Sequence, residues 1–88
     1  MKLEVGQIVM SRAGRDVTRY YVVVQVAQSR VLLANGSKYT LQAPKGKNIR
    51  HISPTKTVLT PSDMQTDDQL KQALAVYNQN RAAQMQGG

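Results

Sequence analysis

The chain has 88 residues, a formal net charge of +7 and no cysteine. The lack of cysteine excludes disulfide scaffolds, thiolate zinc sites and cysteine nucleophiles, and a chain this short builds only a modest core without a deep pocket. Residues 1–60 carry a net charge of +8 and residues 61–88 a net charge of −1. Such asymmetry is typical of a protein with an anionic partner, usually nucleic acid, although solubility alone also explains it.

The expected compartment is the cytoplasm. Small secreted domains usually carry disulfides, and no apolar run approaches the roughly 18 residues that span a bilayer. The N-terminal segment alternates polar and apolar residues and includes Glu4, unlike a signal peptide. We therefore expect no membrane partner.

Short strands and turns alternate through the front half. Alternating residues predict a strand near 7–12, and the β-branched and aromatic run 20–27 predicts a second. A third run, 30–35, leads to Asn35-Gly36, a strong hairpin signal because both residues accept positive φ. The segment 37–42 then reads as the fourth strand, so this part of the chain resembles a series of hairpins.

The next segment, 43–48, is predicted as a loop, and 49–53 as a closing strand that ends at Pro54, which cannot donate a ladder hydrogen bond. Five short strands connected as hairpins predict a mainly β fold, a small antiparallel barrel whose closure would remove exposed edges.

Composition changes after this barrel. Residues 55–65, bounded by prolines, are predicted as a linker, and a helix is predicted near 67–82, with Thr66 and Gln69 as a capping box. One apolar stripe runs along this helix: Leu70, Ala73, Leu74 and Tyr77. We expect it to pack on the barrel or on a partner helix. The domains are thus 1–54, the barrel; 55–65, the linker; and 66–88, the helix and a frayed tail.

The connection 12–19 places three arginines and Asp16 around Gly14. By itself Gly14 is most simply explained as an ordinary turn residue. A wider pattern extends from Glu4 to Pro54, in five pieces: Val5-Gly6, Ala13-Gly14-Arg15-Asp16, the valine-rich run 21–26, Val31-Leu32-Leu33 with Gly36, and Asn48-Ile49-Arg50-His51-Ile52 with Pro54.

This pattern resembles the KOW motif, and most closely the archaeal and eukaryotic large-subunit ribosomal proteins of the fourteen-e type. The family often has a glycine-basic pair after the acidic loop residue, where this chain has Val17-Thr18-Arg19 and so keeps the base but lacks the glycine. From Thr55 onward the chain resembles no family that we can name.

The resemblance implies an SH3-like barrel that binds RNA, with ribosomal RNA as the expected target, at or beside a ribosome. Arginine suits this role because its guanidinium contacts phosphate with two hydrogen bonds, and lysines flank Gly46. The predicted RNA-binding residues are Arg12, Gly14, Arg15, Arg19, Tyr20, Lys45, Lys47, Arg50 and His51.

Several of these residues have a second interpretation. Asp16 is expected to shape the loop by accepting a loop amide or pairing with an arginine. Tyr20 can stack on an unpaired base or be a half-buried strand aromatic. His51 is a strand residue with a possible contact to phosphate or a 2′-hydroxyl.

Catalysis has little support, because the acids show no pairing across a cleft and the core leaves no room for a substrate cavity. A single histidine offers almost nothing for a metal site, and we expect no cofactor, no metal and no small-molecule substrate. The alternative function is a protein-interaction adaptor of the transcription or translation machinery that uses the barrel and the helical stripe Leu70, Leu74 and Tyr77.

Overall fold

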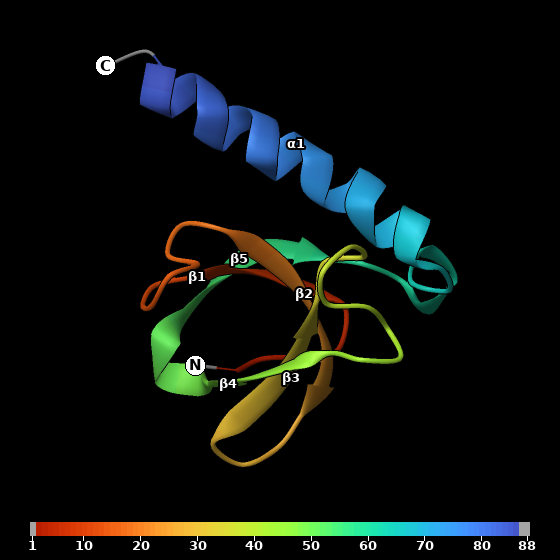
Figure 1. The fold of residues 1–88 in the computed structure, drawn as a ribbon. Coiled ribbons are helices and arrows are strands. Elements are labelled where there is room, and N and C mark those ends of the chain that lie inside the picture. The colour runs from red at the N-terminus through yellow and green to blue at the C-terminus, as the bar shows by residue number, and fades with distance from the viewer. Residues whose placement is uncertain (1, 87–88) are drawn as a thin grey trace.

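Five strands and one long helix make up the fold (Figure 1). The structure is a computed structural model that describes residues 2–86. Two short 3₁₀ helices, η1 and η2, flank the last strand. The elements in chain order are β1 (Gln7–Ser11), β2 (Tyr20–Val26), β3 (Arg30–Ala34), β4 (Lys45–Asn48), η1 (Ile49–His51), β5 (Ile52–Val58), η2 (Pro61–Asp63) and α1 (Asp67–Gln86).

All five strands belong to one antiparallel sheet with the order β4-β3-β2-β1-β5. The predicted mainly β fold, with a five-stranded antiparallel sheet and a C-terminal helix, is confirmed. The sheet bends around an interior (Figure 1), but β4 and β5 form its two edges and are not paired with each other. Closure into a barrel is therefore not confirmed.

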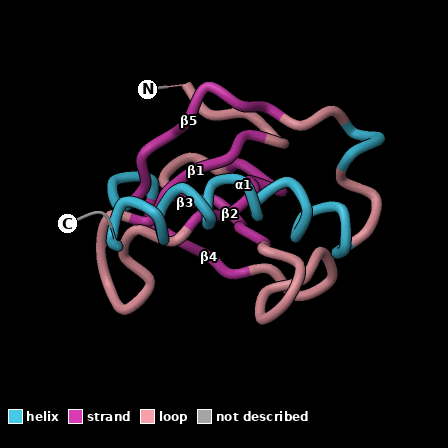
Figure 2. Tube along the Cα trace, turned by 90° about the horizontal axis from the view of Figure 1, so that it is seen from above, coloured by secondary structure: helices cyan, strands magenta, loops and turns pink. Residues whose placement is uncertain are grey.

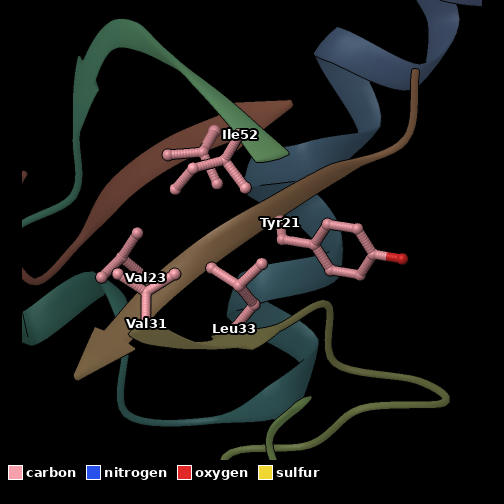
Figure 3. Close-up of a cluster of buried hydrophobic side chains, with 6 residues drawn as sticks. Tyr21, Val23, Val31, Leu33 and Ile52 are labelled. Carbon is pink, nitrogen blue, oxygen red and sulfur yellow. The ribbon is translucent and has the colours of Figure 1, made fainter. Parts of the chain in front are cut away.

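The concave side of the sheet holds one hydrophobic cluster. Side chains alternate between the two faces of a strand, so Tyr21 and Val23 of β2 point inward. Figure 3 shows these side chains together and the Tyr21 hydroxyl pointing out of the cluster. The buried members are Val9, Tyr21, Val23, Val31, Leu33 and Ile52.

The convex side is covered by α1, which crosses β1, β2 and β3 when seen from above (Figure 2). Its stripe residues Leu70 and Leu74 are 0% and 2% exposed and pack against Ile8, Val22 and Ala34. Of the two expected packing partners for this stripe, the barrel and a partner helix, the structure shows the sheet. Full burial of one such leucine contributes about 1.5–3 kcal/mol, so the helix is part of the folded core.

The start of α1 follows the predicted capping box. The Gln69 N–H donates to Thr66 Oγ1 over 3.2 Å, and the Thr66 N–H donates to Gln69 Oε1 over 3.1 Å. These bonds satisfy backbone donors that have no partner within the helix. The helix continues to Gln86, beyond the predicted end at 82.

The second half of the sheet differs from the prediction. Residues 37–42 form a loop rather than a strand, and β4 occupies 45–48 inside the predicted loop. The predicted closing strand begins as the 3₁₀ helix η1 and continues as β5 to Val58. Pro54 lies within β5 because this strand is an edge, where a missing N–H removes no ladder bond on the open side.

Candidate nucleic-acid interface

The connection between β1 and β2, hereafter loop 12–19, is closed by two backbone hydrogen bonds. Ser11 N–H donates to the Arg19 carbonyl and Thr18 N–H to the Ser11 carbonyl, each over 2.8 Å. Gly14 has φ +86° and Thr18 has φ +70°. Thr18 therefore adopts a left-handed conformation that favours glycine.

Asp16 belongs to this loop, and its side chain is only 10% exposed. Its Oδ1 accepts from Ser11 Oγ and Lys47 Nζ, both at 2.9 Å, and its Oδ2 accepts from Lys45 Nζ at 2.8 Å and Tyr21 Oη at 3.0 Å. Asp16 thus has the expected structural role, although its cationic partners are two lysines rather than an arginine. These four hydrogen bonds connect loop 12–19 to β1, β2 and β4. Together they are called the Asp16 brace below.

The pKa of Asp16 reflects these contacts. Burial alone would raise the pKa of the carboxyl, but the hydrogen bonds from Lys45, Lys47, Ser11 and Tyr21 outweigh it and hold the pKa well below 3.8, its ordinary value. Burial, together with the hydrogen bond to Asp16 and the negative charge there, raises the pKa of Tyr21. The carboxylate therefore stays ionised and the phenol stays neutral.

Strand pairing explains why Lys45 and Lys47 point toward Asp16. Lys45 pairs with Leu33 and Lys47 with Val31 across the β3–β4 ladder, and directly opposed residues project to the same face. Leu33 and Val31 belong to the concave cluster, so both lysines are aimed at the concave side. Lys47 is only 9% exposed, and its ammonium also donates to the Ala13 carbonyl over 2.9 Å.

A groove of about 520 Å³ lies between loop 12–19 and the loop at 35–44. It includes five predicted RNA-binding residues: Gly14, Arg15, Arg19, Lys45 and Lys47. Its other lining residues are Asp16, Tyr21, Asn35, Ser37, Lys38 and Tyr39. Loop 12–19 and β4 therefore meet at one cationic groove.

Lys38 also lines the groove, although it is not among the residues predicted from the sequence. It is exposed, and its Nζ lies 5.6 Å from the centre of the Tyr39 ring. Lys45 Nζ lies 5.1 Å from the same ring. No local signal marks Lys38, because it reaches the groove only through the fold of the 35–44 loop.

The other predicted residues lie outside the lining of this groove. Arg12, Arg50 and His51 are exposed, and the Arg12 N–H donates to the His51 carbonyl over 2.7 Å, which places η1 beside loop 12–19. Arg50 lines a separate hollow of about 450 Å³. The Tyr20 ring is half-buried and lies 4.9 Å from the Tyr77 ring of α1, so Tyr20 has the environment of the strand aromatic.

The described part of the chain offers little for metal chemistry. Across residues 2–86, no three histidine, aspartate or glutamate side chains gather into a group suited to a metal ion. Within the same range, α1 lacks the continuous apolar length that crossing a membrane requires.

Comparison with known proteins identifies relatives that are similar in sequence. No family model matches the chain. Large ribosomal subunit protein eL14 of Desulfurococcus amylolyticus is 30% identical over 71 residues, which are 78% of this chain and 74% of the relative. The eL14 protein of Sulfolobus acidocaldarius is 30% identical over 73 residues, or 82% and 76% of the two chains.

The chain belongs to the eL14 family of large ribosomal subunit proteins. The eL14 protein of Staphylothermus marinus is 28% identical over 74 residues, covering 83% of this chain and 77% of the relative. The predicted resemblance to this ribosomal group is confirmed, whereas the KOW motif stays a prediction. The eL14 matches cover more of the chain than the predicted resemblance, which ended at Pro54.

Proposed function

We propose that this eL14-family protein docks on structured RNA of the large ribosomal subunit and acts in translation on cytoplasmic ribosomes. The RNA-contacting residues would be the exposed arginines of loop 12–19, on a loop that Lys45 and Lys47 hold in place through Asp16. Family membership supports the ribosomal setting, because the relatives are large ribosomal subunit proteins. The charge of +8 on residues 1–60 supports an anionic partner.

The main support for this proposal is that some cations near the loop are paired with an acid, whereas others are exposed and unpaired. Lys45 and Lys47 are bound to Asp16, so their charges brace the loop. Arg15 and Arg19 remain exposed on that braced loop and form no ion pair with an acid in the described chain. Cations on a preordered loop lose less entropy when they meet phosphates than cations on a flexible one.

The adaptor alternative depends on the helical stripe as a contact surface. Leu70 and Leu74 of this stripe are buried against the sheet, and the Tyr77 hydroxyl is hydrogen-bonded to Thr57. A partner could reach these side chains only if the helix left the sheet. RNA docking requires no such rearrangement, because Arg15 and Arg19 are already exposed.

The proposal is tested by crosslinking the protein to RNA in cells and sequencing the attached RNA. We expect the reads to concentrate on large-subunit ribosomal RNA. The double variant Arg15→Ala, Arg19→Ala should lose most of this signal, while Lys56→Ala, an exposed charge on β5, should keep it. Reads without enrichment on ribosomal RNA would contradict the proposal.

A further inference from the structure

We propose that the groove between loop 12–19 and the 35–44 loop receives one unpaired nucleotide of the bound RNA. This inference rests on the proposed function and goes beyond it, because it names the RNA feature that is recognised. The groove volume of about 520 Å³ lies within the range of roughly 300–1,000 Å³ that suits a small organic ligand. Bases in an RNA duplex are largely inaccessible to side chains, whereas unpaired bases can be splayed into such a groove.

Cations stand on both sides of the groove. Arg15 and Arg19 come from loop 12–19, and Lys38 comes from the opposite loop. All three are exposed, and none pairs with an acid among residues 2–86. The one acid in the lining, Asp16, is already bound to two ammonium groups. A phosphate at the rim therefore meets positive charge from two directions, with no unpaired carboxylate opposing it.

Tyr39 supplies the aromatic surface that a base requires. Its ring is half-buried and contacts the concave cluster, so its position is fixed by packing. Its backbone N–H donates to Asn35 Oδ1 over 3.0 Å, and the same oxygen accepts from the Ser37 N–H over 3.0 Å. A base that stacks on a fixed aromatic ring loses little freedom beyond its own, and such stacking tolerates different bases.

Lys38 contributes both to the positive charge at the rim of the groove and to the environment of the Tyr39 ring. Its ammonium lies 5.6 Å from the centre of the Tyr39 ring, a distance at which a cation is held weakly by the ring face. Because the side chain is exposed and flexible, an entering base displaces the ammonium from the ring toward the nucleotide phosphate. Lys38 therefore contributes to the binding of a nucleotide in the groove, while it is dispensable for folding.

The test compares two hairpin RNAs, one fully paired and one with a single unpaired adenosine bulge. We expect the wild-type protein to bind the bulged hairpin about tenfold more tightly, from the added stacking. Lys38→Ala should reduce this preference by the share that the Lys38 contact to the nucleotide phosphate contributes, while the share from stacking on Tyr39 remains. Lys56→Ala, which deletes an equal charge from β5, should keep the whole preference.

Equal binding of both hairpins, with Lys38→Ala and Lys56→Ala behaving alike, would overturn the groove inference and leave RNA docking intact. Failure of the protein to bind either hairpin or large-subunit ribosomal RNA would overturn the proposed function as well. The two failures are therefore distinguishable.

A second measurement locates the bound nucleotide on the wild-type protein and requires no substitution. Adenosine 5′-monophosphate titrated into the isotope-labelled protein should shift the backbone amide signals of Arg15, Lys38 and Tyr39 in NMR spectra. Inorganic phosphate at the same concentration should shift the Tyr39 signal much less, because it has no base to stack. Equal shifts with both probes, or shifts spread evenly to Lys2 and Lys56, would contradict a nucleotide site in this groove.

Discussion

The Asp16 carboxylate holds loop 12–19 in place, because it accepts hydrogen bonds from β1, β2 and β4 at once. Its removal would leave the Lys47 ammonium, in a side chain only 9% exposed, without its counter-charge. Breaking a buried ion pair by deleting one partner costs several kcal/mol, while replacing both partners with apolar groups is often tolerated.

Asp16→Asn should lower the free energy of unfolding by about 3 kcal/mol, as measured by urea denaturation. Asp68→Asn is the matched control, because Asp68 is exposed and its ion pair with Lys71 is long, at 3.9 Å; it should change stability by less than about 1 kcal/mol. Adding Lys47→Met to Asp16→Asn should recover part of the loss. Equal stability of the two single variants would contradict a structural Asp16 brace.

The low pKa of Asp16 also predicts how stability responds to acid. In the unfolded chain this carboxyl takes up a proton near its ordinary pKa of 3.8, whereas in the folded protein it stays ionised to a much lower pH. The unfolded state therefore binds more protons below about pH 4, and the free energy of unfolding falls as the pH decreases there. Urea denaturation from pH 6 to pH 2 should show this loss in the wild type.

The comparison with Asp16→Asn isolates this contribution, since both proteins share all other acids. The stability difference between them should be constant above about pH 5 and shrink as the pH falls below about 4. A difference that stayed unchanged down to pH 2 would show that the Asp16 carboxylate is not stabilised in the folded state.

At the scale of elements, α1 and the 35–44 loop support each other. The Leu41 N–H donates to Asp67 Oδ1 at the start of α1 over 2.9 Å. Gly36 packs so closely on this helix that a methyl group there would lie far inside contact distance of the Asp67 carbonyl oxygen. The helix therefore fixes the loop that carries Lys38 and Tyr39.

Gly36→Ala should destabilise the protein by about 3 kcal/mol, because φ is +84° and the added methyl group meets helix backbone. Gly14→Ala is a matched control with φ +86° and only ordinary contacts, 3.6 Å from Asp16 Oδ1 and 3.7 Å from Lys47 Nζ. It should cost about 1 kcal/mol, for the backbone conformation alone. Thermal denaturation of both variants measures the difference; equal losses would mean that the loop and helix are not packed this closely.

Elements with local signals are predictable from the sequence. The strands β1, β2 and β3 follow from alternation and β-branched residues, and α1 follows from its stripe and capping box. The strand β4 cannot be predicted in this way, because its Lys-Gly-Lys sequence has no strand signal of its own. It becomes a strand by pairing with β3 and through the bond from Lys45 to Asp16, which lies 29 positions earlier. For the same reason the site could be predicted only in part: Gly14, Arg15 and Arg19 are neighbours in sequence, whereas Lys38 meets them only in the fold.

At the scale of the whole molecule, the fold separates two uses of charge. The concave side pairs Lys45 and Lys47 with Asp16, and the exposed arginines and Lys38 surround the groove above them. The helix covers the opposite side of the sheet and adds an apolar second core. The exposed cations at the groove are therefore presented by a sheet that is packed on both of its faces.

The most direct test of the account is the salt dependence of RNA binding by the wild type and by the double variant Arg15→Ala, Arg19→Ala. Each phosphate contact contributes about one to the slope of log affinity against log salt concentration. We expect a steep wild-type slope that falls by about two in the double variant, while Lys2→Ala, Lys56→Ala keeps the wild-type slope. A flat wild-type line, or equal slopes for both double variants, would contradict it.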